Sequence, residues 1–298
     1  MLAKKQDKII GLIILSAFVI FFGAAIIIFM RLGAPTDVSI SGVGEKIAVI
    51  ELESVIYSSR SIVRQFKRYE KDKSIKAIVF RIESPGGGIA ASQEIYEHVR
   101  RVRDSGKPVI ASMGSVAASG GYYVALGADS IMAIAGTTTG SIGVIATFPN
   151  YSKLMQKIGI EMTVIKSGQF KDSGSPYRAL STKDKKYLQD WINNGYEQFV
   201  AAVAQERNMT LKEVRTLADG RVYSGEQAYN YGLIDTLGTY EDAIDLAAKA
   251  AGIEGEPRVV RLQKKKLTTF DLLFSYDLKE LVSSYVSAWP KVHYLMSY

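Results

Sequence analysis

The chain has 298 residues, 47% of them hydrophobic, and a formal net charge of +7. It has no cysteine and only two histidines, His98 and His293, which excludes thiol catalysis, disulfides and cysteine metal sites. A serine–histidine triad or a multi-histidine metal site is poorly supported. The positive charge includes no dominant basic block beside aromatic residues, so nucleic-acid binding is not indicated.

An apolar stretch near the N-terminus predicts a membrane anchor. Ile9 to Met30 carries no charge and is long enough to cross a hydrocarbon core of about 30 Å. A cleaved signal peptide is the alternative, but its apolar core is usually shorter, about 7 to 15 residues, and ends in a small-residue cleavage site. Here the apolar run continues directly to Arg31. An uncleaved anchor is the better interpretation.

Flanking charges predict the orientation of this anchor. Lys4, Lys5 and Lys8 precede it, whereas Arg31 alone follows closely. Because lysine and arginine are retained on the cytoplasmic side, we expect a single-pass protein of the cytoplasmic membrane with its N-terminus inside and its catalytic domain extracytoplasmic. Residues 1–31 are predicted as the cytoplasmic N-terminus and anchor, and residues 32–45 as a linker rich in glycine, proline and serine.

Residues 46–255 alternate apolar runs of strand type with segments of helical periodicity, which is typical of an α/β domain with a parallel sheet. We expect strands over Lys46–Leu52, Ile75–Ile82, the run from Pro108 to the turn before Ser119, Ser130–Ile134, Glu161–Lys166 and Pro257–Leu262. Helices are expected over Ser58–Lys73, Ile89–Val102, the segment after Ser119, Ser152–Ile158, Thr182–Arg207, Leu211–Leu217, Gly225–Tyr231 and Tyr240–Ala251. Residues 256–298 form an aromatic-rich C-terminal extension in which an amphipathic helix is plausible.

Three glycine-rich segments follow strands, at residues 84–88, 119–121 and 140–143. Ser119 would stand at a helix N-terminus, beside free backbone N–H groups and the positive end of the helix dipole. A hydroxyl in that position can be a nucleophile, but it can also be an ordinary capping serine, and other residues have to decide between the two. An oxyanion hole needs two N–H groups from different loops, and glycine lets the backbone approach closely. Gly86 or Gly87 could supply one donor and Gly120 the other. Phosphate cradling is a weaker alternative, because no GxxxxGK[ST] occurs.

With histidine scarce, a serine nucleophile needs another base. A lysine serves when burial away from carboxylates lowers its pKa from about 10.4 toward neutrality. Lys171 lies in a turn-rich segment rather than on a charged helix face. Its neighbour Asp172 would raise the pKa of Lys171 if both side chains pointed together, so we expect the two to diverge.

Four motifs, in order, resemble those of the signal peptide peptidase A family of membrane serine proteases. The nucleophile motif matches GSVAASGGYY at residues 114–123, the SPGG loop matches residues 84–88, and the general-base segment matches SGQFKD at residues 167–172. A later signature matches DGRVYSGEQA with GLID, residues 219–228 and 232–235. The resemblance covers about residues 46–252. One departure is Glu83 before the SPGG loop, where the wider superfamily often has Asn or Asp.

The resemblance implies a Clp-protease/crotonase-like α/β fold with an N-terminal transmembrane helix and a Ser-Lys dyad. Ser119 would be the nucleophile, Lys171 the base and Ser141 a hydrogen-bond partner of the lysine, with Gly120 and the SPGG loop as oxyanion donors. The family degrades remnant signal peptides in or at the cytoplasmic membrane and uses no metal or nucleotide cofactor. It also implies a homo-oligomer, octameric in the best-known case, in which neighbouring subunits build each active site.

Three alternatives stay open at this point. A related membrane Ser-Lys protease could cleave the hydrophobic tail of another membrane protein, and the dyad alone does not separate the two. A crotonase-like enzyme could use the oxyanion hole on an acyl thioester, although the anchor and the lysine segment disfavour it. A membrane scaffold without catalysis would show no covalent labelling of its serine.

Overall fold

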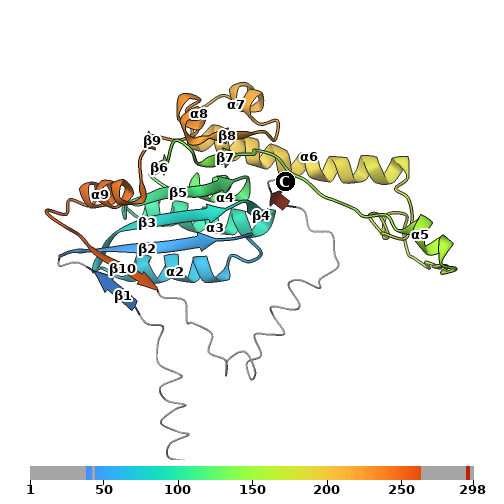
Figure 1. Ribbon diagram of the computed structural model, residues 1–298, viewed down its shortest axis with the longest axis horizontal. Coiled ribbons are helices and arrows are strands. Elements are labelled where there is room, and N and C mark those ends of the chain that lie inside the picture. Colours follow the sequence, from blue (N-terminus) through green and yellow to red (C-terminus); the bar gives the residue numbers. More distant parts are fainter. Residues whose placement is uncertain (1–37, 42–43, 263–292, 296–298) are drawn as a thin grey trace, which may run out of the picture. The chain divides into compact units, whose positions relative to one another are not determined.

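The computed structural model describes residues 38–41, 44–262 and 293–295. Its main sheet follows the order β1-β10-β2-β3-β5-β6-β9, and Figure 1 shows these strands side by side. The strands are β1 (Val38–Ser41), β10 (Arg258–Leu262), β2 (Lys46–Glu53), β3 (Ile75–Ser84), β5 (Val109–Ala118), β6 (Ser130–Ala133) and β9 (Thr236–Leu237). From β10 to β9 every pair on this path is parallel, as the alternation of strands and helices predicts.

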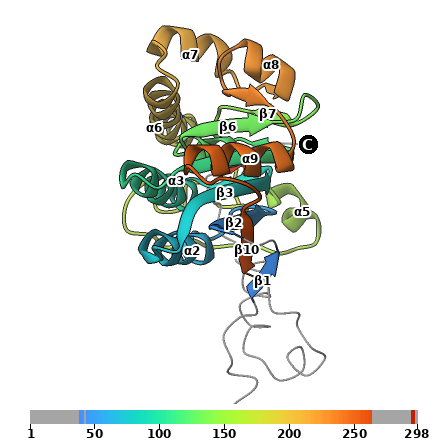
Figure 2. The same ribbon diagram turned by 90° about the vertical axis from the view of Figure 1, so that its left-hand side faces the viewer.

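Helices follow the predicted segments closely. They are α2 (Arg60–Lys71), α3 (Ile89–Asp104), α4 (Gly120–Ala125), α5 (Ser152–Lys157), α6 (Thr182–Glu206), α7 (Leu211–Leu217), α8 (Gly225–Asn230) and α9 (Tyr240–Ala250). Figure 2 shows α2 and α3 together on the same side of β2 and β3. The residues of α2 that the periodicity marks as apolar are buried: Ile62, Val63, Phe66 and Tyr69.

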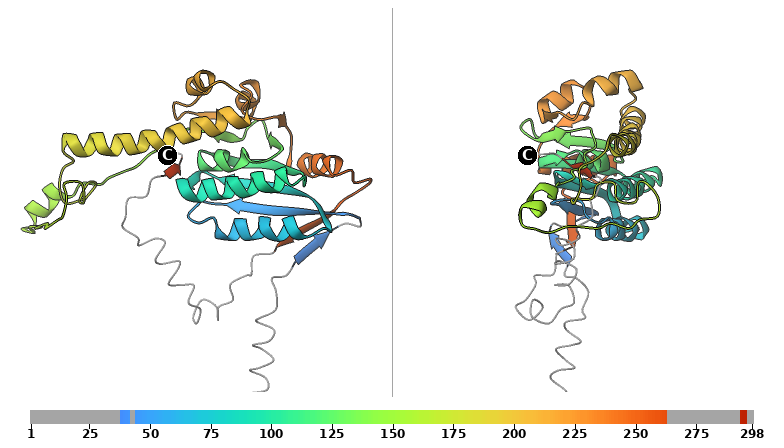
Figure 3. Two further views of the ribbon diagram at one scale, coloured as in Figure 1. Left: turned by 180° about the vertical axis from the view of Figure 1, so that it is seen from behind. Right: turned by 90° about the vertical axis from the view of Figure 1, so that its right-hand side faces the viewer.

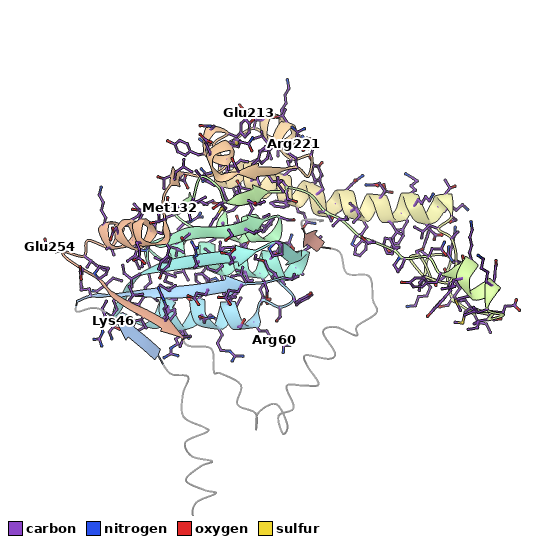
Figure 4. The ribbon with its side chains drawn as sticks, viewed as in Figure 1. Lys46, Arg60, Met132, Glu213, Arg221 and Glu254 are labelled. Atoms are coloured by element: carbon purple, nitrogen blue, oxygen red, sulfur yellow. The ribbon has the colours of Figure 1, made fainter. Side chains whose placement is uncertain are left out.

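The two faces of the sheet are covered by different helices because the strands are apolar on both sides. On one face Phe80 of β3 packs edge-on against Phe66 of α2, with ring centroids 5.2 Å apart. On the other face α9 closes a cluster with residues of β2, β3, β5 and β6. Met132, labelled in Figure 4, is the residue of β6 in this cluster. The mixed α/β architecture is therefore confirmed.

Four short strands complete the described part of the chain: β4 (Gly86–Gly88), β7 (Thr138–Gly140), β8 (Val222–Ser224) and β11 (His293–Leu295). The glycine-rich segment at 84–88 predicts only a break after a strand, whereas residues 86–88 form a strand that bridges to Ile56 and pairs antiparallel with β11. Glycine has no strand propensity of its own, so only these partners order the segment.

One predicted strand is wrong. Glu161–Lys166 has no regular structure and its residues are exposed, with Ile165 97% exposed. A strand needs a partner for its backbone N–H and C=O groups, and no described strand of this chain pairs with the segment. The apolar residues of Glu161–Lys166 are therefore not enough to make the segment a strand.

The N-terminal and C-terminal predictions fall mostly outside the described residues. The anchor at Ile9–Met30 lies outside them altogether, and β1 lies within the stretch whose composition suggests a linker. Among the residues that the structure describes, no helix is long and apolar enough to cross a membrane. In the aromatic-rich extension, the described residues 293–295 form a strand rather than part of a helix.

Candidate active site

Ser119 lies in a strained turn between β5 and α4. Its backbone angles are φ 53° and ψ −115°, a combination that L-residues rarely adopt and that resembles the strand-to-helix turn known as the nucleophile elbow. The side chain is buried, and its Oγ has no hydrogen-bond partner among the described residues. A buried hydroxyl without a partner in a strained turn indicates a group kept for chemistry rather than for folding.

Ser141 is brought beside Ser119 by the pairing of β5 with β7. Ala118 is the register partner of Gly140, and the N–H of Ser119 donates to the carbonyl of Gly140 at 2.7 Å. Ser141 follows directly, also with a positive φ of 51°. Its N–H donates to the carbonyl of Arg221 at 2.8 Å; Figure 4 labels Arg221, the residue before β8. The structure therefore joins two of the predicted site residues through strand register.

The glycine loops also meet at Ser119. A Cβ built on Gly120 would lie 3.0 Å from the backbone nitrogen of Gly87. The N–H of Gly86 already donates to Ser84 Oγ at 3.2 Å, and the N–H of Gly88 donates to Ile56. Because successive strand residues turn their amide groups to opposite edges, the N–H of Gly87 faces away from Ile56. Of the two glycines left open by the sequence, Gly87 is the one whose N–H is taken up by neither Ser84 nor Ile56.

The edge of β4 that faces away from Ile56 pairs with an extended backbone. On that edge β11 pairs antiparallel, with Tyr294 opposite Gly87 and Leu295 opposite Gly86. Addition of a strand to an exposed edge is a common way for proteins to hold peptides, because main-chain hydrogen bonds need no particular side chain. The edge beside Ser119 is thus shaped to receive a peptide main chain.

Lys171 is not brought to Ser119 within the chain. It lies between α5 and α6, exposed, and no ion pair joins it to a described residue. Since Ser119 Oγ bonds to no described group, Lys171 of the same chain makes no hydrogen bond to it. Figures 1 and 3 show α5 and the start of α6 away from α4, whose N-terminus Ser119 precedes.

Asp172 turns away from Lys171, as expected. Its carboxylate accepts hydrogen bonds from Arg178 and from Lys166 Nζ, the latter at 2.5 Å. These hydrogen bonds, the one from Arg178 first, hold the pKa of Asp172 well below its usual range. The acid beside the predicted base is therefore ionised and already paired.

Glu83, which stands out in the sequence only as a departure before the SPGG loop, has a structural role at the site that no motif predicts. Its carboxylate accepts hydrogen bonds from the N–H groups of Ser115 and Val116 at 2.9 and 3.0 Å. It thereby ties the end of β3, where the glycine loop begins, to the part of β5 that leads to Ser119. A Cβ on Gly114 would lie 1.7 Å from Glu83 Oε2, which explains the glycine there. The only sequence signal is an acidic residue directly before the SPGG loop.

A cavity of about 540 Å³ opens beside Ser141. It is lined by residues 141–145, by the middle of α6 and by residues 218–220. No group of three or more histidine or acidic side chains among the described residues is placed to hold a metal ion. The site consists of hydroxyl groups and backbone N–H donors, which suit acyl transfer by a serine.

Comparison with known proteins agrees with this geometry. The model of peptidase family S49 matches residues 101–254, and that of Clp protease matches residues 40–142. A Synechocystis sp. protein assigned as a protease is 43% identical over 212 residues, which cover 70% of this chain and 76% of that protein. An Enterococcus faecium protein assigned as a signal peptide peptidase is 37% identical over 233 residues, 78% of this chain and 63% of that protein.

A third relative is described as a serine protease. The chloroplast serine protease SPPA of Arabidopsis thaliana is 33% identical over 212 residues, 71% of this chain and 31% of that protein. The fold and the buried serine beside two glycine loops define a serine peptidase. The chain belongs to peptidase family S49, and the resemblance to signal peptide peptidase A is confirmed.

Proposed function

We propose that the chain is a membrane-anchored endopeptidase in which Ser119 is the nucleophile and Lys171 the general base, and that it degrades remnant signal peptides. The observation that carries the proposal is the Ser119 hydroxyl, buried and unpartnered in a strained turn between two glycine loops. Serine peptidases need such a hydroxyl next to oxyanion donors.

The reaction follows from these groups. Ser119 Oγ attacks the peptide carbonyl carbon while the uncharged amine of Lys171 takes the hydroxyl proton. The N–H groups of Gly87 and Gly120 stabilise the oxyanion, and Ser141 orients the lysine by a hydrogen bond. When the C–N bond breaks, Lys171 returns the proton to the leaving amine. Water then attacks the acyl ester while Lys171 takes a proton from that water. When the ester bond breaks, Lys171 passes the proton to Ser119 Oγ and the acid product leaves.

The edge of β4 supports an extended peptide as substrate. Pairing through the main chain accepts many sequences, which suits peptides that differ in sequence but share apolar character. The same geometry fits the hydrophobic tail of another membrane protein, and profiling the peptides that accumulate in a deletion strain separates the two. An acyl thioester lacks a backbone to pair with this edge, so the crotonase-like alternative is less supported.

A second copy of the chain supplies Lys171 in this proposal. The arm, defined as residues 145–191, exposes a set of large apolar side chains: Ile145, Tyr151, Leu154, Ile158, Ile160, Met162, Val164, Ile165, Phe170, Tyr177, Tyr187 and Trp191. Exposed apolar area of this extent on one segment is typical of an interface. If the arm packs on a neighbouring copy, these apolar side chains are buried and Lys171 reaches the neighbour's cavity beside Ser141. The same head-to-tail contact, repeated around an axis, closes a ring such as the expected octamer.

Covalent labelling tests the nucleophile. The detergent-solubilised full chain is expected to react with a fluorophosphonate at Ser119 and to cleave a synthetic signal peptide. Ser119→Ala removes both, with a loss of peptidase activity of at least about 1,000-fold. Ser115→Ala, on the exposed side of the same strand, is the matched control. Full labelling of the Ser119→Ala variant would refute the assignment.

Membrane attachment is tested separately. The full chain is expected in the membrane fraction of a producing cell and to resist extraction by carbonate, because an uncharged helix of this length stays in the hydrocarbon core. A chain that starts at residue 32 is expected in the soluble fraction. Release of the full chain by carbonate would show that Ile9–Met30 does not span the membrane.

A further inference from the structure

The chemistry proposed for Lys171 makes the position of its acidic neighbour decisive. A carboxylate within about 4 to 6 Å of an amine favours the ammonium form and raises the pKa of the amine. A protonated lysine cannot take the proton of a serine. Asp172 directly follows Lys171, so what holds its carboxylate decides whether the lysine can act as a base.

Arg178 holds that carboxylate with both of its oxygens engaged. Its Nε donates to Asp172 Oδ2 at 2.9 Å and its Nη2 donates to Oδ1 at 2.8 Å, a bidentate pair. Lys166 Nζ adds a third bond to Oδ1. The side chain of Asp172 is only 10% exposed. A planar fork fixes a carboxylate in one orientation, which a single ammonium does not.

Arg178 is in turn fixed from the start of α6. Its Nη1 donates to Asp184 Oδ2 at 2.6 Å and its Nη2 to Oδ1 at 3.2 Å. The buried Asp184 also accepts from Ser173 Oγ and completes the capping box with Ser181, so its position is set by the helix itself. The hydrogen bond from Arg178, then those from Ser173 and Ser181, hold the pKa of Asp184 well below its usual range.

We propose that Arg178 is a positioning residue of the peptidase: by holding Asp172, it leaves Lys171 without a carboxylate partner. In the part of the chain that the structure describes, the ion pairs at this turn join Lys166, Asp172, Arg178 and Asp184, and none of them includes Lys171. The inference rests on the proposed role of Lys171 as general base.

A purely structural role for Arg178 makes a different prediction. If the arginine only braces the loop, removing either partner of the bidentate pair should damage activity alike. If it restrains the charge of Asp172, Arg178→Gln lowers the activity and Asp172→Asn does not, because asparagine carries no negative charge to hold Lys171 in its ammonium form. The two single variants therefore separate the roles even though both break the same ion pair.

The experiment is a pH profile of kcat/KM for a synthetic signal peptide, measured with the detergent-solubilised full chain. In Arg178→Gln the carboxylate of Asp172 keeps only its bond from Lys166 and can turn toward Lys171, where it favours the ammonium form, so the rising limb of the profile moves to a pH that is higher by about 1 or more. At a fixed pH below that limb, kcat/KM falls about 10-fold for each pH unit by which the limb moves. Above the limb the activity returns. Asp172→Asn in the same background restores the original profile.

Arg215→Gln is the matched control, since Arg215 pairs with Glu197 at 2.7 Å on another part of the surface, and its profile is expected to stay unchanged. An unshifted limb in Arg178→Gln, or a shift that Asp172→Asn does not reverse, overturns the inference. Lys171→Ala is measured alongside. An active Lys171→Ala refutes the proposed function, whereas an inactive one with an unshifted Arg178→Gln refutes only the role of Arg178.

Discussion

Subunits that carry Ser119→Ala and subunits that carry Lys171→Ala are expected to recover peptidase activity when they assemble together, although neither variant is active alone. Removal of the nucleophile lowers kcat by at least about 1,000-fold, and removal of the base by about 100- to 10,000-fold. The structure does not join the two groups within one chain, since Ser119 Oγ bonds to no described residue. A site that draws one group from each subunit stays intact wherever a wild-type serine meets a wild-type lysine.

The expected recovery can be estimated. In a one-to-one mixture that assembles randomly, about one quarter of the head-to-tail contacts pair an intact Ser119 with an intact Lys171. Co-expression of two differently tagged chains and purification through both tags provides the sample, and peptide cleavage provides the measurement. The double variant Ser119→Ala, Lys171→Ala co-assembled with itself is the blank. If co-assembled single variants stay as inactive as that blank, the shared site is wrong.

Gly87→Ala is expected to abolish most activity while the rest of the fold survives. A Cβ at this position would lie 2.3 Å from the carbonyl oxygen and 2.6 Å from the nitrogen of Ile56, both backbone atoms that cannot move aside cheaply. The strand β4 must shift, and its N–H leaves the oxyanion position next to Gly120. Loss of one oxyanion donor lowers kcat by about 100- to 1,000-fold.

Gly136→Ala is the control for this prediction, because its Cβ would meet nothing within 4 Å. It is expected to keep wild-type kcat and KM. Circular dichroism and thermal unfolding of Gly87→Ala establish that the chain still folds. Gly87→Ala with a wild-type kcat would remove this residue from the oxyanion hole, whatever its effect on stability.

Much of the fold is predictable from the sequence because its signals are local. The apolar spacing of α2 marks the four residues that are buried, and the Ser181 cap sets the start of α6 at the expected place. The strands β2, β3 and β5 follow from continuous apolar runs. The segment Glu161–Lys166 has the same kind of signal but no partner, so it forms no strand.

The candidate site is predictable only in part for a related reason. The motifs around Ser119 and Lys171 are found through the resemblance to a known family, and only the expectation that Asp172 turns away from Lys171 follows from residue chemistry at short range. The choice of Gly87 over Gly86 depends on which N–H group Ser84 occupies, and that bond forms only when the loop closes. Glu83 and Arg178 carry no distinctive pattern, since their partners are set by strand register and by the start of a helix.

The sequence by itself determined the alternation of strands and helices and the absence of thiol chemistry, whereas Ser119 and Lys171 were predicted as the reacting residues through the resemblance to a known family. Periodicity and side-chain type are local properties, so they can be read without coordinates. Only the tertiary structure decided that Ser141 stands beside Ser119, that Glu83 ties β3 to β5, and that Lys171 of the same chain stays apart. These depend on strand register and on contacts between residues far apart in the chain, which no local pattern encodes.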